Sequence, residues 1–143
     1  FSGYWNNAEA TAADFRDGWF HMGDVLVREP DGRLSFVDRV KYMIKSGGEN
    51  IYPAEIERVL LRLPGVLEAG VVRRLDATWG EVPVAVVAHT GEASADALRQ
   101  ACRQHLPSFK VPKEIVFVAP GSLPRNPSGK LVRRDLEQLL AER

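Results

Sequence analysis

The strongest strand signals of the chain lie close together and determine its fold class. Residues 66–72 (VLEAGVV) and 82–88 (VPVAVVA) are short apolar runs, separated by a polar loop at residues 76–81. Short runs rich in valine are typical of β-strands. A third strand-like run covers residues 115–119. We therefore expect a sheet of about three strands.

Helical patterns surround these strands. Pro53 suits the first position of a helix, which Pro64 and Gly65 would end. Ser94 suits the N-cap of a second helix, and a last helix is expected near the end of the sequence. The apolar residues that share one face of the first and last helices are Ile56, Val59, Leu60 and Leu63, and Val132, Leu136, Leu139 and Leu140. From residue 39 onward the pattern predicts a small α+β domain.

Two hairpins are expected before the first helix. Residues 25–28 and 33–37 flank a Pro-Asp-Gly turn, which is typical of a β-hairpin. Residues 40–44 and 50–52 form a second, shorter extended pair around two adjacent glycines. Residues 1–37 are expected to form a separate strand-rich element.

Composition narrows the possible partners. The 143 residues include 19 basic and 19 acidic side chains, so nothing favours a polyanion such as a nucleic acid. No apolar run approaches the ~20 residues that span a bilayer. The single cysteine, Cys102, cannot form an internal disulfide, which makes a reducing cytoplasm the default compartment.

The first twenty residues are unusually aromatic. They hold six of the twelve Phe, Trp and Tyr residues of the chain: Phe1, Tyr4, Trp5, Phe15, Trp19 and Phe20. Such a segment usually has a surface to pack against. It is either an arm that folds over its own domain or a part of a larger upstream domain.

The best candidate for chemistry is the loop at residues 123–130 (LPRNPSGK). Two prolines stiffen it, and Gly129 allows a sharp turn just before Lys130. A lysine held in this way can stabilise the oxyanions of a carboxylate or a phosphate. The glycine spacing of a phosphate-binding P-loop is missing. By spacing alone, a solvated lysine at the start of a surface helix is the simpler interpretation.

Two weaker candidates precede it. The turn formed by Ser46, Gly47, Gly48 and Glu49 could admit a ligand close to the backbone, or it could simply be a tight hairpin turn. The pair Asp24 and Arg39 could bind a sugar diol and phosphate oxygens, or be an ordinary turn acid and a surface base.

The remaining reactive side chains indicate no further site. His21, His89 and His105 are scattered without the spacing of metal ligands, so no metal site is expected. His105 and Cys102 share an apolar helical face, which predicts a core or boundary histidine and an unreactive packing cysteine.

Three ordered motifs together resemble the adenylate-forming superfamily, which holds acyl-CoA synthetases, luciferases and adenylation domains of nonribosomal peptide synthetases. They are residues 17–24 (DGWFHMGD), 38–57 (DRVKYMIKSGGENIYPAEIE) and 124–130 (PRNPSGK). Residues 47–53 (GGENIYP) resemble the acyl- or aryl-CoA ligase branch more than the peptide-synthetase domains. Met22 departs from the pattern, because threonine is usual before the Gly-Asp pair.

The resemblance implies a domain division and a role for each candidate residue. Residues 1–38 would be the tail of a large N-terminal domain that ends at the hinge residue Asp38, and residues 39–143 the small mobile C-terminal domain. Asp24 and Arg39 would bind the nucleotide. Lys130 would reach the reacting carboxylate and α-phosphate during adenylation, whereas the turn at residues 46–49 would line the pantetheine tunnel.

The implied function is that of a C-terminal fragment of an AMP-forming acyl-CoA synthetase. Such an enzyme uses ATP, Mg²⁺ and CoA to convert a carboxylic acid to acyl-AMP and then to acyl-CoA. The magnesium ligands and the acyl pocket would lie on the missing large domain, so the chain alone is expected to be inactive. The alternatives are a noncatalytic stand-alone or split-enzyme module, or a peptide-synthetase adenylation domain.

Overall fold

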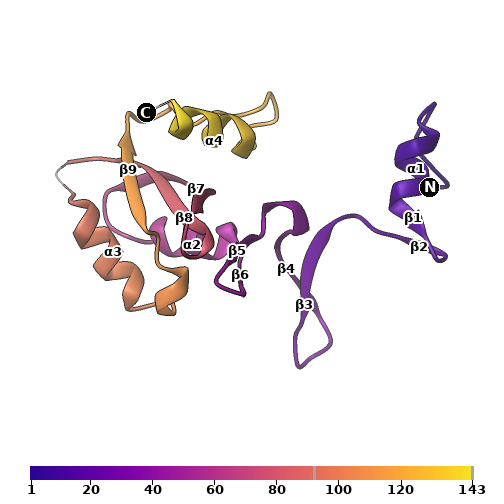
Figure 1. Cartoon of the computed structure of the whole chain (residues 1–143), viewed down its shortest axis with the longest axis horizontal. Coiled ribbons are helices and arrows are strands. Elements are labelled where there is room, and N and C mark those ends of the chain that lie inside the picture. Colours follow the sequence, from indigo (N-terminus) through magenta and orange to yellow (C-terminus); the bar gives the residue numbers. More distant parts are fainter. Residues whose placement is uncertain (92, 143) are drawn as a thin grey trace. The chain divides into compact units, whose positions relative to one another are not determined.

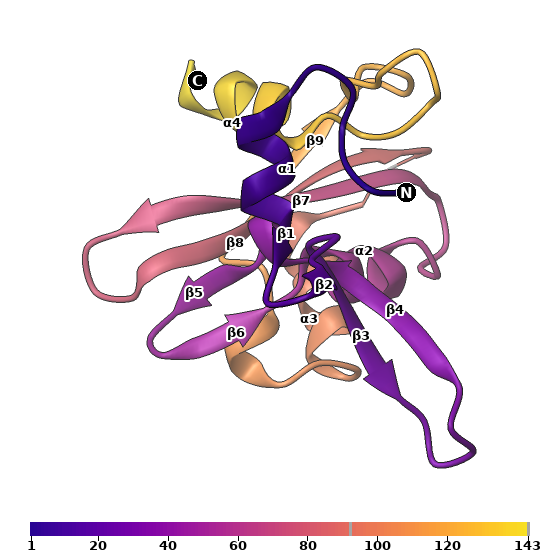
Figure 2. The ribbon, with the colours of Figure 1, turned by 90° about the vertical axis from the view of Figure 1, so that its right-hand side faces the viewer.

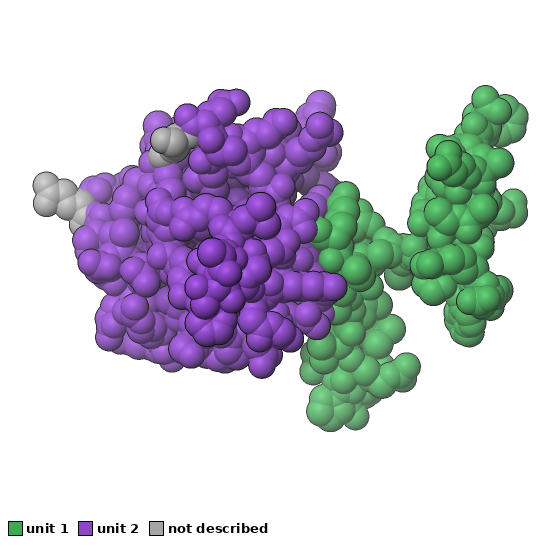
Figure 3. All heavy atoms as spheres, viewed as in Figure 1, with its two compact units in different colours: residues 1–41 green, residues 42–143 purple. Residues whose placement is uncertain are grey.

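A computed structural model gives the fold and describes residues 1–91 and 93–142. The chain forms two compact units, residues 1–41 and residues 42–143, shown in green and purple in Figure 3. The short 3₁₀ helix η1 (Val40–Tyr42) covers the junction of the two units in the sequence.

The first unit contains four strands, and it begins with a helix that the sequence patterns did not predict. Helix α1 (Ala8–Asp14) is capped by Asn7, whose side chain accepts a hydrogen bond from the Ala10 amide at 3.0 Å. The two-residue strands β1 (Phe15–Arg16) and β2 (Trp19–Phe20) then form a small hairpin. Helix α1 buries no residue, so it lacks the apolar stripe that normally reveals a helix in a sequence.

The expected Pro-Asp-Gly hairpin is confirmed. Strand β3 (Asp24–Arg28) pairs with β4 (Leu34–Arg39) in antiparallel register, with a bulge between Val25 and Leu26. Asp31 accepts hydrogen bonds from the Arg33 backbone and side chain within the turn.

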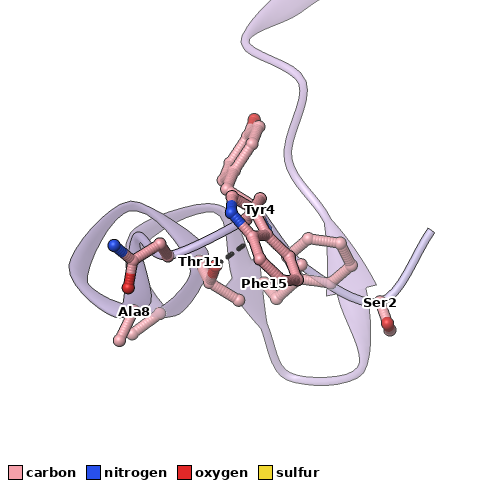
Figure 4. Close-up of a pocket in the computed structure, with 9 residues that line it drawn as sticks. Ser2, Tyr4, Ala8, Thr11 and Phe15 are labelled. Atoms are coloured by element: carbon pink, nitrogen blue, oxygen red, sulfur yellow. Dashed lines mark hydrogen bonds between the residues drawn. The ribbon is translucent and has the colours of Figure 1, made fainter.

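The aromatic residues of the first unit largely pack on one another. The Phe1 ring lies edge-on to Phe15 and Phe20, with ring centroids 5.3 Å and 5.0 Å away. Nearby, the Tyr4 amide donates to Thr11 Oγ1 at 2.9 Å beside a shallow hollow (Figure 4). Trp5 and Trp19 remain 97% and 75% exposed.

The second unit contains the expected α+β fold. Strands β7 (Val66–Asp76) and β8 (Gly80–His89) form a long antiparallel hairpin, and β9 (Glu114–Val118) runs parallel to β8. The second predicted hairpin, β5 (Ile44–Ser46) and β6 (Glu49–Ile51), joins the same sheet through the pair Ser46 and Gly80. The three expected strands and this hairpin therefore form one sheet of five strands.

Helices cover both faces of this sheet. Helices α2 (Pro53–Leu60) and α3 (Ala95–Arg103) lie on one face, and α4 (Arg133–Ala141) lies on the other (Figures 1 and 2). The 3₁₀ helix η2 (Ser108–Lys110) precedes β9. The predicted N-cap is confirmed, since Ser94 Oγ accepts from the Ala97 amide at 3.1 Å.

The core consists of two clusters, one on each face of the sheet. Val71, Ala85 and Val87 pack with residues of α2 and α3, whereas Val72 and Val86 pack with Leu136 of α4. Successive side chains of a strand point to opposite faces, so neighbouring valines contribute to different clusters.

One of the two side chains predicted for the face of α3 lies elsewhere. Cys102 is fully buried, and burial raises the pKa of its thiol, as expected for a packing cysteine. His105, by contrast, is exposed. Helix α3 ends at Arg103, so the helical periodicity that placed His105 on the buried face no longer applies there.

Candidate functional site

The Lys130 loop is held in shape by one asparagine. Asn126 Oδ1 accepts hydrogen bonds from the Ser128 amide, the Ser128 hydroxyl and the Lys130 amide, at 3.1, 2.8 and 2.9 Å. The Asn126 amide in turn donates to the Lys130 carbonyl at 2.9 Å. Gly129 adopts a φ of +79°, which favours glycine. The loop therefore fixes the backbone of Lys130.

The Lys130 side chain itself is exposed. Within residues 1–91 and 93–142, no carboxylate or carbonyl oxygen pairs with its ammonium group. An unpaired ammonium on a fixed backbone is available to an anionic ligand.

The glycine turn between β5 and β6 is held by Trp79, directly before β8, and by Glu81 of β8. The Gly47 amide donates to the Trp79 carbonyl at 2.9 Å, and the Lys45 amide donates to Glu81 Oε2 at 2.9 Å. Gly47 and Gly48 have φ values of +57° and +88°. Two hydrogen bonds therefore attach the turn and its flanking strand to the start of β8.

The two glycines face different surroundings. A Cβ atom on Gly47 would lie 2.7 Å from the Trp79 ring, whereas a Cβ on Gly48 would meet nothing within 4 Å. Glu49 is exposed and Ser46 is buried. A hollow of about 290 Å³ adjoins the turn and is lined by Ser46, Gly47, Glu49, Trp79, Ser108, Phe109 and Lys113.

The sequence patterns did not identify Trp79 or Glu81 as parts of this turn. Asp76 orders the tight loop that carries Trp79, because its Oδ1 accepts from the Thr78 and Trp79 amides at 2.9 Å. The Trp79 and Thr78 amides lower the pKa of Asp76. An Asp followed two residues later by Thr-Trp-Gly is a recognisable turn signal, but its partner, the glycine turn, lies about thirty residues earlier.

Lys130 and the glycine turn belong to opposite ends of the β7–β8 hairpin. Arg125 of the lysine loop contacts Glu68, which pairs with Ala88 at the open end of the hairpin. The glycine turn joins the sheet at Gly80, where β8 leaves the connecting turn. Asp76 lies eight positions after Glu68 (76 − 68) in β7, which corresponds to about 26 Å along the strand at ~3.3 Å per residue.

Asp24 and Arg39 are brought together in the first unit. They are a register pair of β3 and β4, and Arg39 Nε lies 2.8 Å from Asp24 Oδ1. Arg39 also donates to the Met22 carbonyl at 2.7 Å. The pair presents a carboxylate and a guanidinium side by side.

Asp38 is buried in β4, and its Oδ1 accepts from the Arg39 amide at 2.8 Å. The two compact units divide after Lys41, three residues beyond Asp38. Among the described residues, no three His, Cys, Asp or Glu side chains are grouped as a metal site. No helix in the described part of the chain is long and apolar enough to cross a membrane.

Comparison with known proteins agrees with the family that the three sequence motifs resemble. The family model described as the AMP-binding enzyme C-terminal domain matches residues 55–130. A 2-succinylbenzoate--CoA ligase of Bacillus cytotoxicus is 48% identical over 141 residues, which are 99% of this chain and 29% of that protein.

Solved structures of CoA synthetases have the same fold as this chain over part of their length. The o-succinylbenzoate CoA synthetase (MenE) of Bacillus subtilis, in complex with the acyl-adenylate intermediate OSB-AMP, superimposes with a TM-score of 0.88 at 41% identity, covering 94% of this chain and 28% of that one. A fatty acyl CoA synthetase of Mycobacterium tuberculosis gives a TM-score of 0.74 at 42% identity, over 98% of this chain and 28% of that one.

The chain thus spans under a third of the length of these relatives, and it matches their C-terminal region. The family model covers more than half of its residues and ends on Lys130. The chain belongs to the AMP-binding enzyme C-terminal domain family.

Proposed function

We propose that the chain is the mobile C-terminal part of an AMP-forming acyl-CoA synthetase and works with a large N-terminal domain. The observation that carries the proposal is the placement of Lys130 and the glycine turn at opposite ends of one long hairpin. A unit built in this way can present one end or the other to a shared site by rotating as a body.

In the first half-reaction a carboxylate oxygen attacks the α-phosphate of ATP and pyrophosphate leaves. Two anions must approach each other, so a cation between them lowers the barrier. The exposed, unpaired ammonium of Lys130 suits this role. Asp24 would bind the ribose hydroxyls, with Arg39 beside it on the same nucleotide.

In the second half-reaction the CoA thiol attacks the acyl carbonyl and AMP leaves. The Lys130 end then withdraws by rotation about Asp38, and the turn at residues 46–49 lines the path of the pantetheine arm. The open space at Gly48 supports this assignment, because a side chain there would project away from the protein into that path.

The substrates in this proposal are ATP, CoA and a carboxylic acid. Mg²⁺ would accompany ATP, but the described residues offer no cluster that fits it, so its ligands are assigned to the N-terminal domain. A cytoplasmic location is proposed from the single buried cysteine.

A graft tests the proposal. This chain would replace the matching C-terminal region of the Bacillus cytotoxicus 2-succinylbenzoate--CoA ligase, to which it is 48% identical. We expect the graft to catalyse ATP–pyrophosphate exchange with 2-succinylbenzoate and to form the CoA thioester. A folded graft that performs neither half-reaction would contradict the proposal and favour a noncatalytic module.

A further inference from the structure

We infer that Glu68 of β7 is the positioning residue for Lys130. Its carboxylate holds the start of the lysine loop: Oε2 accepts from the Gly121 amide, just before the loop, at 2.7 Å, and Oε1 accepts from Arg125 Nη2 at 2.9 Å. This inference rests on the proposed function, because it assigns a role in the adenylation step.

Arg125 transmits the position of Glu68 to Lys130. Its Nη1 donates to the Gly129 carbonyl at 2.9 Å, directly before Lys130. Arg125 also forms a β-bridge with Leu131, directly after it. Gly129 is therefore tied to the guanidinium that Glu68 holds, and Leu131 is tied to the backbone of the same arginine.

Apolar contacts fix the base of the same loop. Leu123 and Leu131 pack over Gly70 of β7, where an added Cβ would lie 3.3 Å from the first side chain and 2.9 Å from the second. Glu68 and Gly70 lie two residues apart in β7. The Glu68 side chain and a side chain placed on Gly70 would therefore lie on the same face of the sheet. One face of one strand thus carries both the polar and the apolar attachment of the loop.

Glu68 is suited to this role over a wide pH range. The Gly121 amide and then Arg125 lower the pKa of the Glu68 carboxyl. The group is therefore charged at neutral pH and holds Arg125 by a charge-assisted bond. Since no described residue pairs with the Lys130 ammonium, the reach of that group depends on where the loop holds its backbone.

A purely structural ion pair is the competing explanation, since exposed pairs contribute little to function or stability. The chain offers a matched control in the ion pair between Arg74 and Glu114, which joins β7 to β9 in the same sheet without touching the loop. Glu114→Gln removes one carboxylate charge, as Glu68→Gln does.

The first test uses the chain itself. Amide hydrogen exchange by NMR should become faster at Gly121, Gly129 and Lys130 in Glu68→Gln, and stay unchanged there in Glu114→Gln. Unchanged exchange in both variants would overturn the claim that Glu68 orders the loop. This result does not depend on enzymatic activity.

The second test uses the grafted ligase. Glu68→Gln should lower kcat for ATP–pyrophosphate exchange by about tenfold or more, because a misplaced catalytic group costs rate without weakening ground-state binding. The KM values for ATP and the acid should stay unchanged. The rate of thioester formation from supplied acyl-AMP should also stay unchanged. Equal loss of both half-reactions, or no loss, would overturn the inference. An inactive unsubstituted graft would instead count against the proposed function.

Discussion

Gly47 and Gly48 are adjacent glycines that have different surroundings. Both have positive φ values, but an added Cβ atom would meet another residue only at Gly47, where it would clash with the Trp79 ring. The sequence predicts a flexible pair of glycines at this turn. It cannot show which one is confined, because Trp79 lies 32 positions after Gly47 (79 − 47).

This difference predicts unequal costs of substitution. Gly48→Ala should lower the free energy of unfolding by about 1 kcal/mol, the typical cost of a left-handed non-glycine residue. Gly47→Ala should cost at least about twice that, because the new methyl group also displaces Trp79. Urea unfolding followed by circular dichroism measures both, and equal losses would show that Trp79 does not confine the turn.

Gly48 is also the residue at which stability and activity should separate. In the grafted ligase, a bulky substitution such as Gly48→Leu should slow thioester formation and leave ATP–pyrophosphate exchange largely intact, because the side chain would obstruct the proposed pantetheine path. Rates of the two half-reactions, measured separately, test this. Damage confined to pyrophosphate exchange would remove the turn from the CoA step.

The lowered pKa of Glu68 gives a pH prediction. Its pKa lies below the ordinary 4.5 in the folded chain, so its stabilising contribution is present above that pH and is lost as the pH falls through the folded pKa. The stability difference between the unsubstituted chain and Glu68→Gln should therefore be constant near neutral pH and shrink below about pH 4.5. Denaturant unfolding from pH 7 to pH 3 measures it, and a difference that grows on acidification would contradict the contacts assigned to Glu68.

At the scale of elements, the sequence patterns predicted the strands better than their ends. The apolar centres of β7 and β8 were identified, but both strands continue toward a short turn through the mostly polar residues 73–76 and through residues 80–81. Those residues pair across the hairpin, which a hydrophobicity pattern does not reveal. The short helix α1 was missed because it buries nothing.

The sequence patterns also could not predict one polar contact between elements. Glu57 of α2 accepts from the Val71 amide of β7 at 2.8 Å and from Arg133 of α4 at 2.9 Å. The Arg133 guanidinium lies 4.8 Å from the centre of the Tyr42 ring. Glu57 and Arg133 are 76 residues apart, and the contact exists only once the sheet has brought both helices together.

Removing this contact should be costly. Glu57→Ala should lower the free energy of unfolding by about 3 kcal/mol, because it leaves the nearly buried Arg133 without its carboxylate. Glu55→Ala, two residues earlier on α2, removes a more exposed partner of Lys110 and should cost about 1 kcal/mol or less. Thermal and urea unfolding of both variants test this, and equal costs would contradict the structural role of Glu57.

At the scale of the molecule, the two core clusters contain only residues of the second unit. A chain reduced to residues 42–143 should therefore keep its fold and unfold cooperatively, with a far-UV spectrum of the same α+β type. Calorimetry and circular dichroism measure this. A shortened chain without a cooperative transition would show that the first unit contributes to the core.

Three ordered motifs in the sequence are enough to indicate the family and the candidate residues Asp24, Arg39 and Lys130. The pairing of Asp24 with Arg39 follows from the strand register, which is shifted by one residue at the bulge between Val25 and Leu26. The placement of Lys130 and the glycine turn at opposite ends of β7 and β8 follows from long-range pairing. Local patterns carry no information on such pairing.

The most direct test of the account is the effect of Lys130→Ala on the two half-reactions of the grafted ligase, with Arg134→Ala as a control for loss of a nearby exposed cation. We predict that Lys130→Ala lowers ATP–pyrophosphate exchange by about a hundredfold or more. It should spare thioester formation from supplied acyl-AMP, and Arg134→Ala should change neither rate. Equal loss of both half-reactions in Lys130→Ala would contradict the proposal that one rigid unit presents Lys130 for adenylation and withdraws it for thioester formation.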